Sequence, residues 1–526
     1  MMSAPGPLAL FVAVACTVAM VGFGLLVSRR QRSLDDYFLA SRASRWPAIG
    51  LALYASNISP TAIIALAGAA YAFGISVYDY EWSATVVLVF FCVFLLPAVL
   101  GSRVYTMPEF LERRYDRSAR VYFAALTLFL LVFVDSAAAL YSGALVCRML
   151  MPAVPLWALV ALLAGVASLY TLTGGLRAVM WTGAVQAVLL IGSACIIATA
   201  TFLRVGGWQA LTSRVGPGML SLIEPAGSAG VPWPGLLFGI PVLGFYYWCT
   251  NHYIVQRVLS ARSLDDGRRG ALLTGLLKLP ELFLLVLPGT CALVLYPHLS
   301  NPDQVYPDLM RNLLPAGLLG VVAAGFIGAT LAAFGSTLNC ASALITIDLF
   351  GQIAPRVAAA HPVRIGRLSA LGVLVVAVLW APQIQRFGDL WQYLQAVLAY
   401  AVPPIVALFV TGQFWARASA AGARATLLVG TVCGATLFML TTVLRVVQLQ
   451  FLYAAPILLA IDLAVMVGVS LRHPAPRSAA VDALVWSSAD YRAETQRLRG
   501  LSPFSNYRLQ GLALLLLTAL IVVAFR

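Results

Sequence analysis

Residues 271–289, ALLTGLLKLPELFLLVLPG, form an apolar run that two ionisable side chains interrupt. The run is close to the roughly 20 residues that a helix needs to cross the hydrocarbon core of a bilayer. Lys278 and Glu281 lie three positions apart, a spacing that places both side chains on one face of a helix. We therefore predict a transmembrane helix that carries charge at bilayer depth.

An ionisable side chain at that depth costs about 2.5–3.5 kcal/mol, so it needs a partner or a water-filled cavity. Lys278 is also the only lysine in the chain. One interpretation is that Lys278 lines a hydrated cavity and donates hydrogen bonds to a solute. The other is that Lys278 and Glu281 form a buried ion pair that only holds helices together. The sequence leaves both interpretations open.

The whole chain has the composition of a membrane protein. Of its 526 residues, 61% are hydrophobic and 10% are charged, and the mean hydropathy is +0.90. Soluble proteins keep about a quarter of their residues charged, which excludes a soluble domain. The net charge of +14 comes from arginines spread between apolar runs, so we expect no nucleic-acid partner. The eight cysteines are scattered singly, so we expect no disulfide framework and no metal site.

Apolar runs of about 20 residues predict an all-α polytopic membrane protein with about 14 transmembrane helices. The run 8–27 lacks the basic start and the cleavage site of a secretory signal, and we interpret it as the first span. The predicted spans are 8–27, 47–72, 80–101, 121–148, 153–174, 179–203, 233–255, 271–296, 317–349, 368–385, 389–413, 425–446, 450–471 and 508–525.

Arginine placement predicts how the chain lies in the membrane. Arginine clusters follow the first span and the third span, and the later clusters fall on the same side if the chain alternates. The positive-inside rule makes that side cytoplasmic and places both termini outside, in a plasma (inner) membrane. The segment YTMPEFLERRY, 105–115, predicts an interfacial helix or a plain cytoplasmic connector. The polar loop 472–507 is predicted to be cytoplasmic.

Two spans carry helix-breaking residues at bilayer depth. ASNISPT, 55–61, places Pro60 after Ser59, and YYWCTNHYIVQ, 246–256, places Asn251 among other polar residues. Each break alone is also explained by a kink or a satisfied core amide. These are spans two and seven, however, and matched breaks in two inverted halves are typical of a transport site.

We accordingly predict a single transmembrane transporter domain over 1–526. Its parts are an extra N-terminal helix (8–27), a first repeat (47–203), an inverted second repeat (233–413) and extra C-terminal helices (425–525). A channel would show a repeated filter motif, and an enzyme would show a catalytic constellation. The sequence contains neither, so we expect no catalytic residues.

Further polar residues in the spans suit a carbohydrate. Aromatic rings can cover the faces of a sugar, while amides and carboxylates bind its hydroxyls. We therefore predict a small polar solute, with a sugar or related polyol as the first candidate. The residues are Tyr80 and Glu81 in the third span, Asp135 in the fourth, and Trp391, Gln392 and Gln395 in the eleventh.

Seven segments occur in an order that a known family shares: LDDYFLASR (34–42), ASNIS (55–59), GISVYDYEW (74–82), VYTMPEFLERRY (104–115), LTGGLRAVMWT (172–182), YYWCTNHYIVQR (246–257) and STLNCASALITIDLF (336–350). They resemble the sodium/solute symporter family, and within it the sodium–sugar cotransporter-like branch. GGLRAV and MPEF mark the family, and YEW and LLK favour the sugar branch. The resemblance implies a five-plus-five inverted-repeat core over about 45–413 that works by alternating access.

The resemblance also implies roles for individual residues. Ala62 and Ala84 stand where the family often has polar contacts, so the solute site is related but altered. The implied solute contacts are Asn57, Glu81, Asn251, Lys278 and Gln395, with Tyr80 and Trp391 in an outer gate and Tyr253 in an inner gate.

The family's sodium site departs further. The resemblance implies that the backbone carbonyls of Ala55, Ile58 and Ala329 bind the ion, but the two adjoining hydroxyl positions are Ala332 and Ala333. The family's aspartate after GGL is Gly183 here. A small hard cation needs several oxygens to replace its hydration shell. We therefore predict sodium-independent or proton-coupled transport.

Asp135 is the candidate proton site, because apolar neighbours favour a protonated acid. The alternative is a buried acid paired with Lys278 or with a backbone group.

We expect a secondary transporter without a cofactor, with sodium or a proton as the coupling ion. Its partners are a small solute and the bilayer, with no obligate protein partner. A non-transporting solute sensor and a carrier of an organic acid are the alternatives.

Overall fold

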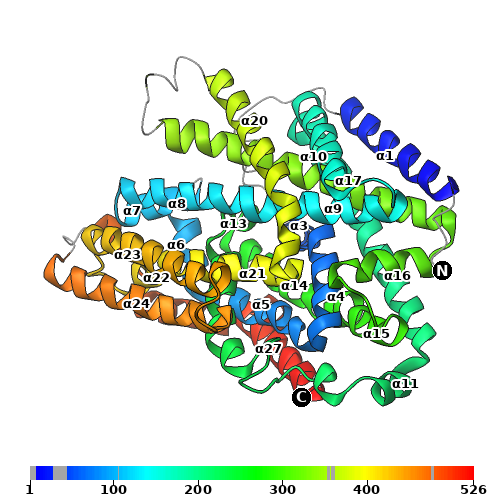
Figure 1. Ribbon diagram of the computed structural model, residues 1–526. Helices are drawn as coiled ribbons and strands as arrows, with labels where there is room; N and C mark the ends of the chain where they lie inside the picture. Colours follow the sequence, from blue (N-terminus) through cyan, green and yellow to red (C-terminus); the bar gives the residue numbers. More distant parts are fainter. Residues whose placement is uncertain (1–6, 28–43, 105, 352–355, 357–361, 475–478) are drawn as a thin grey trace.

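Figure 1 shows the computed structural model, which describes residues 7–27, 44–104, 106–351, 356, 362–474 and 479–526. For residues 169–185 the model describes the course of the backbone but not the side chains. Every regular element within these ranges is a helix, which confirms the predicted all-α class. The segment LDDYFLASR, 34–42, lies outside the described residues.

The helix break predicted at 55–61 is present. α3 (Trp46–Asn57) ends two residues before α4 (Pro60–Phe73) begins. Ser59 has an extended backbone, and its Oγ accepts a hydrogen bond of 3.1 Å from the amide of Ala62, so it caps α4. Pro60 occupies the first turn of α4, where its missing N–H needs no partner. The backbone is therefore non-helical at Ile58 and Ser59, inside a predicted span.

The second predicted break is also present. α12 (Ile240–Phe245) continues into the π-helical turn η7 (Tyr246–Thr250), and the helix is interrupted at Asn251, where ψ is 118°. The Oδ1 of Asn251 accepts a hydrogen bond of 3.0 Å from the amide of Tyr253 and so caps α13 (His252–Leu259). The structure thus confirms a discontinuous helix at both predicted positions.

Two further helix pairs are bent, and the sequence analysis does not predict either bend. α14 (Leu264–Lys278) meets η8 (Leu282–Val286) and α15 (Leu287–Leu295) at 40°, with Pro280 between them. α21 (Leu390–Ala401) meets α22 (Pro403–Phe414) at 54°. Proline removes a backbone donor and clashes with the preceding turn. The run 271–289 is therefore broken just after Lys278.

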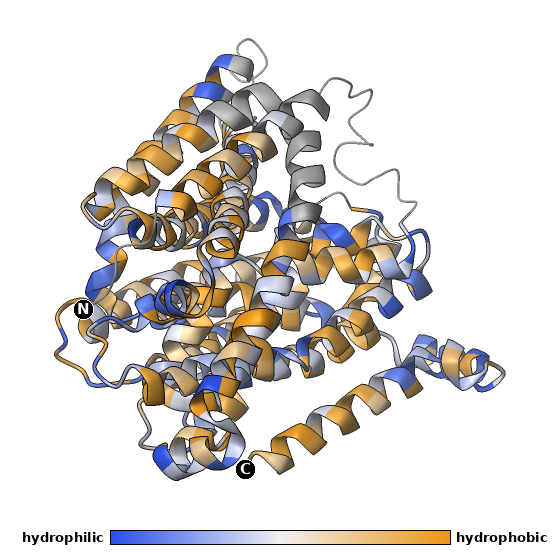
Figure 2. Ribbon diagram, turned by 90° about the vertical axis from the view of Figure 1, so that its right-hand side faces the viewer, coloured by the Kyte–Doolittle hydropathy of each residue, from blue (hydrophilic) through white to orange (hydrophobic). Residues whose placement is uncertain are grey.

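Apolar residues extend along most of the helices (Figure 2). Among the described residues, eight helices are long and apolar enough to cross a membrane, or up to ten if each bent pair is one span. This number is lower than the fourteen predicted spans, partly because most of the predicted spans 47–72 and 80–101 falls in one continuous candidate, Pro60–Gly101. In addition, the apolar helices Pro7–Met20, Leu156–Ser168 and Gly235–Thr250 are shorter than the eight counted. The predicted spans 153–174 and 179–203 fall in one helix, α10 (Leu156–Val205). The number of spans and the division into repeats stay predictions.

The remaining elements follow the predicted order of spans. They are α1 (Pro7–Val27), η2 (Gly74–Tyr78), α5 (Asp79–Phe90), η3 (Phe91–Leu95), α6 (Leu96–Gly101), α7 (Met107–Arg114), α8 (Arg117–Leu130), η4 (Leu131–Ser136), α9 (Ala137–Leu150), α11 (Gly207–Arg214), η5 (Pro217–Leu220), η6 (Gly235–Gly239), η9 (Pro302–Gln304), α16 (Val305–Leu313), α17 (Ala316–Ala343), η10 (Leu344–Phe350), α20 (Pro362–Trp380), η11 (Ala381–Phe387), α23 (Ala420–Phe438), η12 (Met439–Val443), α24 (Phe451–Arg472), α25 (Ala479–Asp482), α26 (Ser488–Arg499), η13 (Pro503–Ser505) and α27 (Tyr507–Ala524).

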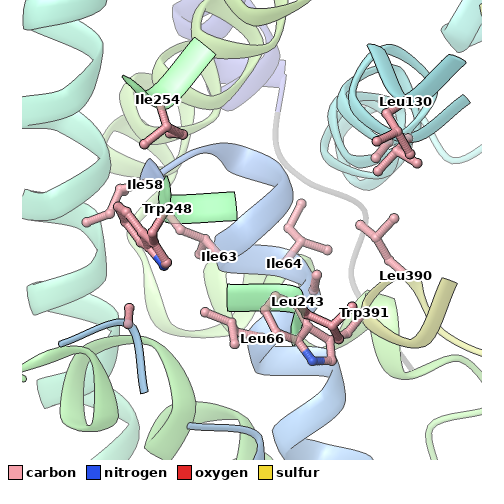
Figure 3. Packing of buried hydrophobic residues seen from close by; sticks show 14 of the residues in the cluster. Ile58, Ile63, Ile64, Leu66, Leu130, Leu243, Trp248, Ile254, Leu390 and Trp391 are labelled. Atoms are coloured by element: carbon pink, nitrogen blue, oxygen red, sulfur yellow. The ribbon is translucent and has the colours of Figure 1, made fainter. Parts of the chain in front are cut away.

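Small residues let the helices of the core approach closely. A Cβ on Gly289 of α15 would lie 2.1 Å from the backbone oxygen of Ala67 in α4, so only glycine fits there. Such close backbone contacts are typical of helices in membranes, where packing replaces the hydrophobic effect as the driving force. Figure 3 shows Leu66 of α4 near Leu243 and Trp391 in this core.

The predicted helix at 105–115 is present as α7, with Pro108 in its first turn. Its last residue, Arg114, is buried and donates hydrogen bonds of 2.8, 3.1 and 2.9 Å to the carbonyls of Gly412, Ala418 and Trp415. These carbonyls lie at and just beyond the C-terminal end of α22, where a cation is favoured. The contacts support the connector interpretation of this segment.

An ion-pair cluster fixes the predicted cytoplasmic loop to α14. Arg268 is buried and donates to the Cys92 carbonyl at 3.0 Å and to Glu494 of α26. Glu494 also accepts hydrogen bonds of 2.6 Å from Arg508 and 2.8 Å from Tyr507. Burial would raise the pKa of Glu494, but the hydrogen bonds and charge of Arg268 and its other partners hold that pKa below its usual value. The ionised carboxylate therefore stabilises the fold.

Replacing Glu494 with glutamine is expected to lower the free energy of unfolding by about 3 kcal/mol, since it leaves the buried Arg268 charge with only the half-exposed Asp265 carboxylate, 3.9 Å away. The loss should be complete above the unfolded pKa of glutamate and should disappear as the pH falls through the folded pKa, which lies below it. Thermal unfolding of the purified protein at neutral and acid pH measures both effects. Glu112→Gln, whose partner Arg120 is partly exposed, should cost less than about 1 kcal/mol.

Candidate functional site

Lys278 lies at the centre of a polar cluster beside the broken helices. Its Nζ donates hydrogen bonds to Asn57 Oδ1, to Glu81 Oε2 and, at 2.9 Å, to Glu281 Oε2. Asn57 is the last residue of α3, and Glu81 lies in the first turn of α5. The three donors of the ammonium group therefore have three protein acceptors, which come from three different parts of the chain.

Aromatic residues enclose this cluster. The hydroxyl of Tyr247 accepts a hydrogen bond of 3.1 Å from Asn57 Nδ2, and the Trp248 ring lies 5.7 Å from Lys278 Nζ. Both residues belong to the π-helical turn η7, next to the second break. The Tyr78 hydroxyl donates to the Leu279 carbonyl at 3.0 Å, beside the bend at Pro280. These aromatic contacts were not predicted from the sequence, although YYW directly precedes the predicted break at Asn251.

The cluster is buried on the lysine side and partly exposed on the amide side. The side chains of Lys278 and Glu281 are 1% exposed, and that of Glu81 is 8% exposed. Asn57 and Tyr247 are only half-buried. The ion pair between Lys278 and Glu281, one of the two interpretations that the sequence leaves open, is therefore present, and Lys278 itself is covered by protein in this conformation.

Tyr80 and Trp391, the predicted outer-gate residues, are in contact. Their ring centroids lie 5.2 Å apart with the planes at 82°, a favourable edge-to-face geometry. Trp391 is buried, and its indole N–H has no hydrogen-bond partner among the described residues. A buried donor without an acceptor is costly, so a ligand oxygen at this position would be stabilising.

The other predicted solute contacts lie outside the lysine cluster. Asn251 uses its Oδ1 to cap α13, and Gln395 is half-buried in α21. Tyr253, the predicted inner-gate residue, lies under the guanidinium of Arg257 at 4.0 Å from its ring centroid. The structure thus brings together Asn57, Glu81 and Lys278 but not all five predicted contacts.

The predicted sodium-site residues lie on α17 and at the first break. Ala329 and Ala332 are buried and Ala333 is half-buried on α17, while Ala55 and Ile58 lie at the end of α3 and in the break. Further along α17, the Thr337 hydroxyl donates to Phe334 O at 2.9 Å and accepts from Ser136. Gly183 lies in α10, in the part for which the structure describes little beyond the backbone.

Asp135 differs from its predicted environment. It lies in the π-helical turn η4, and its side chain is exposed. Within the described ranges it forms no ion pair, and the alternative that it is a buried partner of Lys278 is therefore wrong. Its charge interacts with the nearby Tyr246, Tyr247 and Tyr393. Its neighbours in η4, Val134 and Ser136, are buried.

Known proteins share both the sequence and the architecture. The model of the sodium:solute symporter family matches residues 37–430. The mouse sodium/myo-inositol cotransporter 2 is 32% identical over 489 residues, which cover 86% of this chain and 71% of that protein. The zebrafish sodium/glucose cotransporter 4 is 31% identical over 532 residues, which cover 91% of this chain and 81% of that protein.

Solved structures show the same fold. A Na+-coupled sialic acid symporter in a substrate-bound outward-open state superimposes with a TM-score of 0.72 at 19% identity, covering 89% of this chain and 98% of that one. Mhp1, a nucleobase-cation-symport-1 family transporter, gives a TM-score of 0.55 at 15% identity, covering 86% and 98%. With a family model that spans most of its length and relatives above 30% identity, the chain belongs to the sodium:solute symporter family.

Proposed function

We propose that this protein is a secondary carrier that moves a sugar or related polyol across a membrane by alternating access. The observation that carries the proposal is the lysine cluster, in which Asn57, Glu81 and Lys278 meet beside the first helix break, within reach of the second. Discontinuous helices in matching positions form the solute sites of such carriers. The names of the relatives, myo-inositol and glucose cotransporters, support the solute class.

The donors and acceptors in the cluster suit a polyhydroxylated solute. A sugar hydroxyl both donates and accepts, so it can replace Glu81 or Asn57 as a partner of Lys278 when the cluster opens. The unpaired indole N–H of Trp391 offers a further donor, and the Tyr80 ring lies beside it. An organic acid is less suitable, because two carboxylates already compete for the single ammonium group.

We further propose that sodium is not the obligatory coupling ion. The hydroxyls that the family's sodium site requires are absent at Ala332 and Ala333, and the carbonyls of Ala55, Ile58 and Ala329 are too few to replace a hydration shell.

The positive-inside rule supports a plasma (inner) membrane orientation with both termini outside. A solute sensor on the same scaffold would bind the solute without transporting it, so an uptake assay distinguishes a carrier from a sensor.

Uptake of labelled myo-inositol and glucose into proteoliposomes tests this function. We expect saturable uptake that unlabelled polyols inhibit, and we expect potassium to replace sodium with less than about a twofold change in rate. Protein-free liposomes are the control. Strong dependence on sodium would overturn the coupling proposal, and binding of the solute without uptake would favour the sensor.

A further inference from the structure

The charges of the lysine cluster do not balance. Lys278 carries one positive charge, and Glu81 and Glu281 would carry one negative charge each, so two ionised carboxylates leave the cluster with a net charge of minus one. All three side chains are at most 8% exposed. An uncompensated charge is costly to bury and is usually removed by protonation.

The geometry shows where a neutralising proton would bind. The carboxyl groups of Glu81 and Glu281 accept hydrogen bonds from the same ammonium group, since Lys278 Nζ donates to Glu81 Oε2 and, at 2.9 Å, to Glu281 Oε2. Two like charges in one buried site repel each other, and a single ammonium compensates only one of them. Glu281 Oε1 is also buried without a partner among the described residues, so it is the oxygen free to carry a proton.

No other group facing the cluster supplies the missing charge. Tyr54 of α3 and Tyr78 of η2 interact with both carboxyl groups, Tyr247 of η7 interacts with Lys278 and Glu81, and Cys195 of α10 lies near Tyr54. All four are neutral at physiological pH in their ordinary state. In the described part of the chain no arginine pairs with either carboxylate, so Lys278 is the single cation of the cluster.

We propose that Glu281 binds one proton beside the Lys278–Glu81 ion pair and that this proton is the coupling ion, bound within the solute site in place of sodium. The proton comes from water on one side, binds a carboxylate oxygen of Glu281, and leaves to water on the other side after the cluster opens. The claim that this proton drives a solute rests on the proposed function, whereas the proton site itself does not. Asp135 is not among the hydrogen-bond partners of Lys278, which are Asn57, Glu81 and Glu281, so it lies outside the charge imbalance on which this inference rests.

Infrared spectroscopy of the purified full-length protein tests the proton site without transport. A protonated carboxyl gives a carbonyl band that an ionised carboxylate lacks. We expect this band at neutral pH, and we expect Glu281→Gln to remove part of it. Asp462→Asn is the control, because Asp462 of α24 is buried with both carboxylate oxygens unpartnered and contributes its own band. An unchanged band in Glu281→Gln would overturn the proposal even if the protein carries a solute.

Transport then tests the coupling. With one proton per solute, an inward gradient of about one pH unit should drive about tenfold accumulation in the wild type. In Glu281→Gln the rate of solute exchange, whatever its value, should be independent of pH, and the gradient should drive no accumulation. Asp135→Asn and Asp462→Asn should keep the response to pH. Accumulation of solute by Glu281→Gln under a pH gradient would contradict the assignment of the proton to Glu281. A loss of accumulation in Asp135→Asn alone would contradict it as well.

Discussion

Replacing Lys278 with alanine is expected to reduce solute uptake by about 100-fold or more. The ammonium group has hydrogen bonds to Asn57, Glu81 and Glu281, and its removal leaves two buried carboxyl groups without their cation. Breaking a buried pair costs about 3–5 kcal/mol, and each 1.4 kcal/mol is a factor of ten. Uptake of labelled solute into proteoliposomes, with the amount of folded protein measured by size-exclusion chromatography, gives the loss.

A second variant separates the solute contact from stability. In Lys278→Ala combined with Glu281→Gln, one carboxyl group has been neutralised, so the melting temperature should recover toward the wild-type value. Uptake should stay low, because the donor that binds the solute is still absent. If the double variant regains uptake together with stability, Lys278 only holds the helices together.

Introducing serine at both Ala332 and Ala333 is expected to make uptake depend on sodium. The two hydroxyls would add to the carbonyls of Ala55, Ile58 and Ala329, and the number of oxygen ligands is what a hard cation requires. We expect sodium to raise the uptake rate about tenfold over potassium in this variant, equivalent to about 1.4 kcal/mol.

Ala343→Ser is the matched control, since it adds a hydroxyl to the same helix at a half-buried position away from the break. It should leave uptake insensitive to sodium. A wild-type protein that already requires sodium would show that the ion binds without these hydroxyls. If uptake by the Ala332→Ser, Ala333→Ser double variant stays insensitive to sodium, these two positions do not determine whether sodium is the coupling ion.

The sequence predicted the helix breaks because their causes are local. Pro60 follows Ser59 in a serine-capped start, and Asn251 stands among polar residues in an apolar run, so each break can be found from a few neighbouring residues. The bend at Pro280 has the same local cause and was available to the same reasoning. The spacing of Lys278 and Glu281 placed both side chains on one helix face and left their ion pair as one of two interpretations.

The partners of Lys278 from other helices could not be predicted in this way. Asn57 lies 221 positions and Glu81 lies 197 positions from Lys278, and no local pattern relates residues so far apart. They were expected only from the resemblance to a family. The exposure of Asp135 was not predicted either, because it lies between the buried Val134 and Ser136 in the π-helical turn η4, and such turns have no clear sequence signal.

The hydrogen bonds of Arg114 have a mechanical consequence. A guanidinium that donates to three carbonyls in a fixed fork geometry, at about 1.5–3 kcal/mol for each charged hydrogen bond, behaves as a rigid coupling. It joins α7, which connects helices of the first predicted repeat, to the end of α22 in the second. A movement of α22 relative to α7 would have to break these hydrogen bonds, so we expect the two helices to move as one unit.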